Sequence, residues 1–153
     1  MASVFGKLNL KDQKRILVVN SPPSFEPELR TLRGVFIGRD VNAFDGIEFS
    51  LAFVTTQNEV DTLGKAIAKK AQGDAVVWFA YPKRSSKKYK SEIHRDSGWK
   101  ALGNGGFEPV RMVAIDEDWS AVRFRRVDFI KNLTRGKEHR MSAAGKARAA
   151  RKP

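Results

Sequence analysis

The sequence contains no cysteine and only two histidines, His94 and His139. The absence of cysteine excludes disulfides, thiol nucleophiles, thiolate zinc sites and iron–sulfur clusters. Two imidazoles are too few for a metal cage built from several histidines. Any chemistry of this chain therefore has to come from groups other than thiols.

Long hydrophobic runs are also absent from the 153 residues. No apolar stretch approaches the roughly 18 residues of a membrane span, and the N-terminus lacks the apolar segment of a signal peptide. Hydrophobic residues still make up 41% of the chain, which is enough for one buried core. We therefore expect a soluble cytoplasmic protein, with no membrane partner, that has one domain over 1–135 and a tail over 136–153.

Acidic residues are scarce relative to basic ones, with 17 Asp+Glu against 29 Lys+Arg and a net charge of +12. The segment 136–153 has almost nothing to bury, so we expect it to be disordered when free. It is either an arm that binds nucleic acid or another polyanion, or a tail that only increases solubility. The cations that such an arm would use are Arg140, Lys146, Arg148 and Arg151.

A second basic cluster lies inside the predicted domain and contains no acidic residue. It places Lys83 and four further cations within eight residues, directly after an apolar run. A cluster of this kind is a candidate contact for the phosphates of nucleic acid. The four further cations are Arg84, Lys87, Lys88 and Lys90.

Apolar runs and turn residues predict an alternation of strands and helices. Strands are expected over 15–19, 48–55, 75–81, 110–115 and 119–127, with a short one near 35–37. Helices are expected over 27–32 and over 89–102. A third helix should begin at a capping box formed by Thr56 and Glu59 and end at Gly73. A last helical turn should include Phe129, Ile130 and Leu133.

The run over 75–81 is apolar without alternation, which is typical of a central parallel strand that is covered on both faces. The fold class that follows is α/β: a three-layer Rossmann-like, mostly parallel sheet with a C-terminal antiparallel strand.

Four segments of the sequence resemble one known family. RILVVNSP, FSLAFVTTQNEVD, GDAVVWFAYPKRSSKKYK and VAIDEDWSAVRFRR are similar to a bacterial family of small methyltransferase-like domains. Its members share a strand that ends in Tyr-Pro-Lys with a serine pair, and a later Asp-x-x-Trp-Ser hairpin. The resemblance covers about Lys7 to Arg135. It implies a truncated methyltransferase-like fold and no particular activity.

The turn after the first predicted strand is the usual place for a nucleotide cofactor in such folds. Glycines at this turn normally let backbone N–H groups approach the cofactor closely. Here the turn reads Asn20-Ser21-Pro22-Pro23-Ser24-Phe25, with no glycine and with two prolines that lack an N–H group. We therefore expect no bound cofactor and no activity that depends on S-adenosylmethionine.

Parallel topology would bring the ends of the 75–81 and 110–115 strands to one edge of the sheet. Residues 83–86 and 116–120 would then form a rim that binds an anion through Lys83 and two serine hydroxyls, at the start of the 89–102 helix. The alternative is a structural turn, with Ser86 as a helix cap, Lys83 paired with Asp116, and Trp119 covering the sheet edge. The candidate ligand-binding residues are Asn20, Ser21, Lys83, Ser85, Ser86, Asp116 and Trp119.

Two functions from different classes fit these features. The first is a non-catalytic binding module whose basic cluster and tail contact nucleic acid or another polyanion. The second is an enzyme or sensor for a small anionic metabolite that binds at the rim. A related feature, Arg123 and Arg125 on one face of the last strand, either extends a basic surface or protects an exposed sheet edge.

Overall fold

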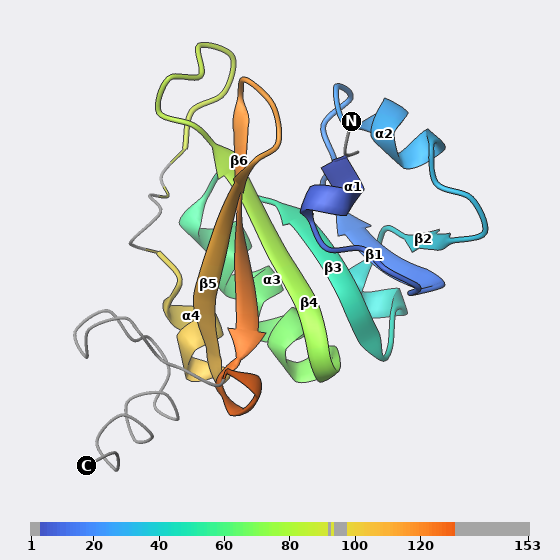
Figure 1. The fold of residues 1–153 in the computed structure, drawn as a ribbon. Coiled ribbons are helices and arrows are strands. Elements are labelled where there is room, and N and C mark those ends of the chain that lie inside the picture. The colour runs from blue at the N-terminus through green and yellow to red at the C-terminus, as the bar shows by residue number, and fades with distance from the viewer. Residues whose placement is uncertain (1–3, 92, 94–97, 131–153) are drawn as a thin grey trace.

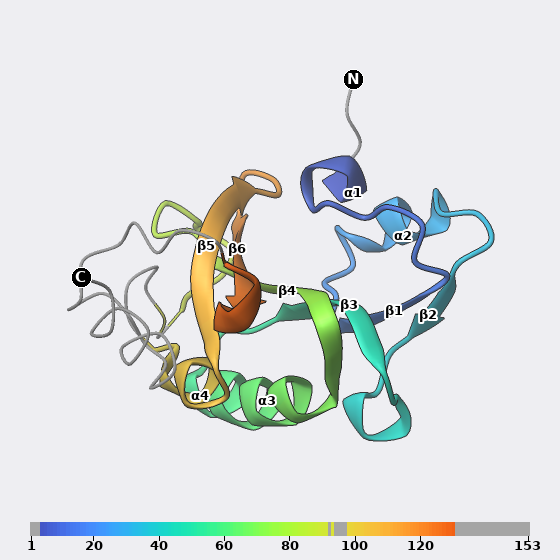
Figure 2. The same ribbon diagram turned by 60° about the horizontal axis from the view of Figure 1, so that its bottom comes forward.

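The structure is a computed structural model that describes residues 4–91, 93 and 98–130. A single six-stranded sheet organises these residues, with helices against both of its faces (Figures 1 and 2). In chain order the elements are α1 (Val4–Lys7), β1 (Arg15–Val19), α2 (Glu26–Arg30), β2 (Phe36–Gly38), the 3-10 helix η1 (Val41–Ala43), β3 (Ile47–Phe53), α3 (Gln57–Lys70), β4 (Ala71–Pro82), α4 (Lys100–Asn104), β5 (Phe107–Ala114), β6 (Trp119–Arg126) and the 3-10 helix η2 (Val127–Phe129).

The strand order in the sheet is β2-β1-β3-β4-β6-β5. The first four strands are parallel to one another, whereas β6 is antiparallel to both β4 and β5. The mostly parallel α/β sheet with an antiparallel C-terminal strand is therefore confirmed. Because β6 lies between two strands, its arginines do not protect an exposed edge, and that interpretation of Arg123 and Arg125 is wrong; β5 forms this edge of the sheet.

The core consists of two apolar layers, one on each face of the sheet. On one face, Val60 and Ile67 of α3 pack in the same cluster as Val77 and Phe79 of β4. On the other face, Phe5 of α1 belongs to the cluster beneath α1 and α2. Figure 2 shows α3 and α4 on one side of the sheet and α1 and α2 on the opposite side. These are the three layers expected from the sequence.

The longest described helix, α3, begins where its sequence predicts. The Thr56 hydroxyl accepts a hydrogen bond from the Glu59 backbone N–H at 3.2 Å, and the Glu59 carboxylate accepts one from the Thr56 backbone N–H at 3.2 Å. This reciprocal capping box satisfies N–H groups that have no partner inside the helix. The helix ends at Lys70, before the expected stop at Gly73, because β4 already begins at Ala71.

The helix expected over 89–102 is wrong for the described residues before Lys100, and only its last residues, from Lys100 to Leu102, are helical. Tyr89, Lys90, Ser91 and Ile93 are not helical, and the helix is limited to α4. The Ser91 hydroxyl accepts a hydrogen bond from the backbone N–H of Ile93 at 2.9 Å. Such a local side-chain bond competes with helix formation.

Three further sequence expectations can be compared with the described residues. The short helix expected over 27–32 is α2, and the last helical turn is η2, whose range ends before Leu133. The tail over 136–153 lies outside the described residues, and so do Arg140, Lys146, Arg148 and Arg151. No helix among the described residues is long and apolar enough to cross a membrane.

Candidate functional site

Successive strands are added on opposite sides of β1, with β2 on one side and β3 on the other. Open α/β sheets bind their ligands at such a point, outside the carboxyl ends of the strands. A cavity of about 360 Å³ lies at this place. Its lining combines residues after β1 and β2 with residues of the first turns of α3, namely Val19, Asn20, Arg39, Asp40, Val41, Asn58, Glu59, Thr62 and Leu63.

Asn20 occupies a strained position at the end of β1. Its φ angle is +59°, a left-handed conformation that asparagine tolerates better than most residues. Its side-chain amide lies 3.3 Å from the carbonyl oxygen of Phe53 and 3.4 Å from Oε2 of Glu59, and donates to both. Asn20 therefore ties the end of β1 to the end of β3 and to the start of α3.

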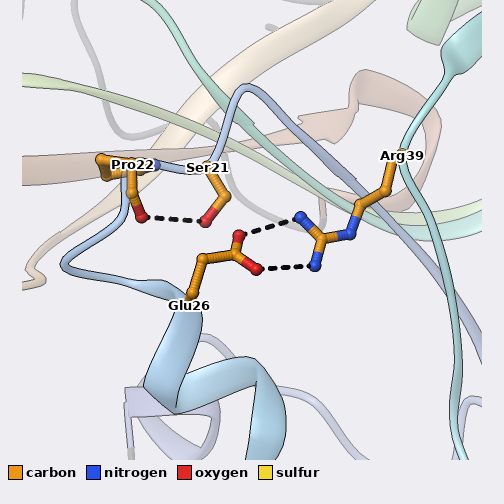
Figure 3. Close-up of polar contacts among 4 residues, drawn as sticks. All are labelled: Ser21, Pro22, Glu26 and Arg39. Atoms are coloured by element: carbon orange, nitrogen blue, oxygen red, sulfur yellow. Dashed lines mark hydrogen bonds and ion pairs between the residues drawn. The ribbon is translucent and has the colours of Figure 1, made fainter.

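Arg39, which also lines this cavity, forms an ion pair that the sequence patterns did not predict. Its two terminal nitrogens donate to the Glu26 carboxylate at 2.9 and 3.0 Å, as Figure 3 shows. The hydrogen bonds from Arg39 lower the pKa of Glu26 to about 2. The same contact raises the pKa of Arg39. The pair bridges the start of α2 and the residue directly after β2.

Ser21 lies beside this ion pair rather than at the predicted rim. Its hydroxyl is 3.4 Å from the carbonyl oxygen of Pro22 and donates to it (Figure 3). Asp40, the residue after Arg39, accepts a hydrogen bond from the backbone N–H of Asn42 at 2.9 Å and so caps η1. The polar side chains at this edge are thus mostly engaged with one another.

Residues 83–86 and 116–120 lie together as predicted. They are at the carboxyl end of β4, away from the cavity beside β1. The backbone N–H of Lys83 donates to the carbonyl of Asp118 at 2.8 Å, and the Ser86 hydroxyl donates to the Asp118 carboxylate at 2.8 Å. The Tyr89 backbone N–H in turn donates to the Ser86 hydroxyl at 3.1 Å. Figure 1 shows the loop after β4 beside the turn between β5 and β6.

Asp116 and Trp119 have structural roles at this rim. One oxygen of Asp116 accepts hydrogen bonds from the backbone N–H groups of Asp118 at 2.8 Å and of Trp119 at 2.9 Å, which fixes the hairpin turn. Trp119 is buried, and its ring lies 5.0 Å from that of Tyr89. Both residues are therefore structural, but the expected pairing of Lys83 with Asp116 is wrong, because Asp116 accepts from the turn backbone and forms no ion pair with Lys83 in the described part of the chain.

Asn20 and Ser21 are not gathered with the rim into one crevice. Aromatic rings fill the sheet edge between them: Phe25 contacts Phe53 at 5.0 Å, and Phe53 contacts Trp119 at 5.1 Å, measured between ring centroids. The predicted anion site at the start of a helix also loses its basis, because Tyr89 does not begin one. The edge therefore carries two separate regions.

The cations of the loop are the least engaged groups at this edge. We define the basic loop as residues 83–90, which contains Lys83, Arg84, Lys87, Lys88 and Lys90. Four of these side chains are exposed and Lys83 is half-buried, while Ser85 is exposed beside them. Within the part of the chain that the structure describes, none of the five forms an ion pair. Lys88 lies 5.7 Å from the centroid of the Tyr89 ring.

Comparison with known proteins gives the fold. No protein-family model matches the sequence, and no curated protein matches it. Among solved structures, an S-adenosylmethionine-dependent methyltransferase from Aquifex aeolicus superposes with a TM-score of 0.53 and 13% identity, over 81% of this chain and 88% of that one. Magnesium protoporphyrin IX methyltransferase from Synechocystis PCC 6803, with bound S-adenosylmethionine, gives 0.51 and 10%, over 80% and 74%. At such identities the likeness shows a methyltransferase-like fold alone.

The residues after β1 do not fit a nucleotide cofactor of the kind that this fold often binds. Two prolines provide no N–H donors there, and the N–H groups of Phe25 and Glu26 already bond to the carbonyls of Pro22 at 2.9 Å and Pro23 at 3.3 Å. The Phe25 ring is 2% exposed, so it fills space beneath the turn. The Glu26–Arg39 pair joins this turn to the end of β2.

The sequence analysis missed Arg39, Asp40 and Glu59 as residues of this edge. A local pattern did exist for Glu59, since the capping box places its carboxylate at the start of α3. Arg39 and Asp40 follow a strand of only three residues, which has too little pattern to locate its end. Within the described residues, no three His, Asp or Glu side chains are grouped closely enough to hold a metal ion.

Proposed function

We propose that this chain is a non-catalytic, cytoplasmic binding module that contacts the phosphate backbone of nucleic acid through the basic loop. We also infer that it belongs to the bacterial family of small methyltransferase-like domains that its sequence segments resemble. The single observation that carries the functional proposal is the basic loop itself. Its five cations project from one end of the sheet and have no described carboxylate as a partner.

Two features of the loop support a binding role over a merely solvated surface. It is anchored to the β5–β6 turn by the Lys83–Asp118 and Ser86–Asp118 hydrogen bonds, so its cations are presented from a fixed base. Cations that are not paired with carboxylates can neutralise phosphates and release counterions, which favours binding. The acidic side chains nearby offset part of this charge, although those of Asp116 and Asp118 already accept hydrogen bonds.

The expected binding is insensitive to base sequence. Stacking on exposed bases needs accessible aromatic rings. Tyr81 is buried, and Tyr89 is half-buried against Trp119. We therefore expect contacts to phosphates to dominate, with similar affinities for mixed sequences of equal length.

The rival function, an enzyme or sensor for a small anionic metabolite at the rim, has less support. A small anion would need donors that converge on an open space. The Ser86 hydroxyl instead donates to Asp118, and the loop after it does not begin a helix whose N-terminus could face an anion. Lys83 is half-buried and Ser85 is exposed, while the indole N–H of Trp119 is buried without a hydrogen-bond partner among the described residues. The three groups differ in exposure and do not define a pocket.

The proposal is tested by fluorescence anisotropy with the full chain and labelled mixed-sequence DNA and RNA, single- and double-stranded, over a series of salt concentrations. Each phosphate contact contributes about 0.7 to 0.9 to the slope of log affinity against log salt, or about 5- to 8-fold in affinity at ~0.1 M salt. The double variant Lys87→Gln, Lys88→Gln should therefore lose roughly 25- to 60-fold in affinity.

A matched control is the double variant Lys65→Gln, Lys69→Gln, which removes the same charge from exposed positions of α3. It should bind nearly as tightly as the unmodified chain. Undetectable binding by the unmodified chain at low salt would refute the proposal. Equal losses in the two double variants would also refute it, because the effect would then come from net charge rather than from the basic loop.

A further inference from the structure

One part of the sheet has no described helix over it. The cluster with α1 and α2 covers β1, β3 and β4 and also includes Trp119 and Ala121 at the start of β6. The carbonyl of Leu8, directly after α1, accepts a 2.7 Å hydrogen bond from the indole N–H of Trp78 in β4. On the same side, none of the helices α1 to α4 lies in front of β5 and β6 in Figure 1, and the short 3-10 helix η2 lies at the Arg126 end of β6. We call this surface the open face of β5 and β6.

The strand register places two arginines opposite one another on the open face. Arg111 of β5 pairs with Arg123 of β6, and Arg123 pairs on its other side with Trp78, whose side chain lies in the cluster beneath α1. Paired residues of neighbouring strands share a face of the sheet. Arg111 is exposed and Arg123 is half-buried. We call Arg111 and Arg123 the arginine pair.

The arginine pair costs stability as it stands. Like charges directly opposite one another on neighbouring strands are destabilising. The Nε atom of Arg123 is also buried and has no hydrogen-bond partner among the described atoms. Burial, followed by the charge of Arg125, lowers the pKa of Arg123.

Asp74, a carboxylate whose charge acts on Arg123, is already engaged. Asp74 binds Arg125 through two hydrogen bonds of 2.7 and 2.8 Å, so its oxygens are held by another guanidinium. Glu108 lies on the same side of the sheet through its pairing with Arg125, but it is 2% exposed, so the open face does not extend to the start of β5. An anion from outside the chain would relieve the repulsion within the arginine pair.

The open face is continuous with the basic loop. The loop begins after Pro82, which pairs with Trp119 at the start of β6. Arg123 follows four residues later on the same strand, a distance of ~13 Å. A guanidinium is well suited to phosphate, because its planar donors can form two parallel hydrogen bonds. We propose that the arginine pair binds a phosphate of the same nucleic acid strand that the basic loop contacts, so that the strand runs down the open face.

This inference rests on the proposed function, and its test is designed to separate the two. The variant Arg111→Gln removes one member of the pair at an exposed position. Its control is Arg33→Gln, an exposed arginine before β2, at the opposite edge of the sheet. Anisotropy with single-stranded nucleic acid should show about a 5-fold loss of affinity for R111Q at ~0.1 M salt and a slope reduced by ~0.7. R33Q should behave as the unmodified chain.

Thermal unfolding distinguishes a binding role from a structural one. Because R111Q relieves repulsion with Arg123, its melting temperature should equal or exceed that of the unmodified chain, even though binding weakens. A loss of affinity together with a lower melting temperature would overturn the inference, and so would R111Q and R33Q binding alike. If R111Q binds normally while the loop double variant does not, only this inference fails. If the unmodified chain binds no nucleic acid, the proposed function fails first.

Discussion

The contribution of the ion pair between Glu26 and Arg39 to the free energy of unfolding can be measured. Its two hydrogen bonds lower the pKa of Glu26 from 4.5 to about 2. In a fully buried pair such a difference would be equivalent to about 3 kcal/mol. The Glu26 side chain is 33% exposed and that of Arg39 is 50% exposed, so solvent screening reduces the expected contribution to about 1 kcal/mol.

The pH dependence follows from the direction of the shift. The folded-state pKa of Glu26 is depressed, so the unfolded chain binds the proton more tightly. The stabilisation is therefore fully present above pH 4.5 and is lost as the pH falls from about 4.5 to about 2. At pH 3 roughly 40% of it should remain.

A double-mutant cycle isolates this contribution from the general effects of acid on a basic protein. Urea unfolding of the unmodified chain, E26Q, R39Q and the double variant at pH 7 and pH 3 gives the coupling free energy at each pH. We expect about 1 kcal/mol at pH 7 and less than half of that at pH 3. E28Q removes a charge from the same helix and is the control. A coupling energy near zero at pH 7, or one that does not change with pH, would refute this account of the edge.

Two further predictions concern the packing and capping of α3. Gly105→Ala should lower the free energy of unfolding, measured with urea, by about 1–3 kcal/mol, because an added Cβ would lie 2.6 Å from the Cβ of Ala68. Combining it with Ala68→Gly should recover part of the loss. An unchanged stability of the single variant would contradict the close packing of α3 and α4. Thr56→Ala should lower the free energy of unfolding by about 1 kcal/mol, whereas Thr56→Ser should retain most of the original stability. Thr62→Ala, at an exposed position of the same helix, should lower it less. Equal losses for Thr56→Ala and Thr62→Ala would rule out a special contribution from the cap.

Much of the fold could be predicted because its signals are local in the sequence. The first strand occupies Arg15–Val19 as expected, since its apolar β-branched run ends at a turn. The capping box needs only Thr56 and Glu59, three residues apart, and both act as the spacing predicts. The terminal hairpin is likewise visible as two apolar stretches separated by a short acidic turn.

The segment before α4 shows where such signals stop. Trp99 and Ile93 are buried as the predicted helix required, with exposed fractions of 1% and 2%. Burial of apolar residues at suitable spacing does not require a helix, because an irregular segment can place the same side chains in the core. The local hydrogen bond of Ser91 to the Ile93 backbone contributes to the irregular conformation.

The Glu26–Arg39 pair could not be predicted for a different reason. Its partners are 13 residues apart and meet only because β2 runs parallel to β1 and returns the chain to the same edge. The arginine pair has the same origin: Arg111 and Arg123 face each other only once the register of β5 and β6 is known. Long-range juxtapositions of this kind depend on topology, so sequence patterns alone do not reveal them.

The distribution of polar groups along the sheet edge gives the two proposals a common physical basis. Near β1, prolines, the Phe25 ring and the Glu26–Arg39 pair fill or satisfy the place where related folds present backbone donors. Near β4 and β6, the cations of the basic loop and the arginine pair form no ion pair within the described residues. Unpaired cations on a rigid sheet reduce stability through mutual repulsion, so their concentration at one end is best understood through binding of an anion. If the basic loop and the arginine pair bound nothing, replacing their cations by neutral residues should stabilise the chain and change no other property.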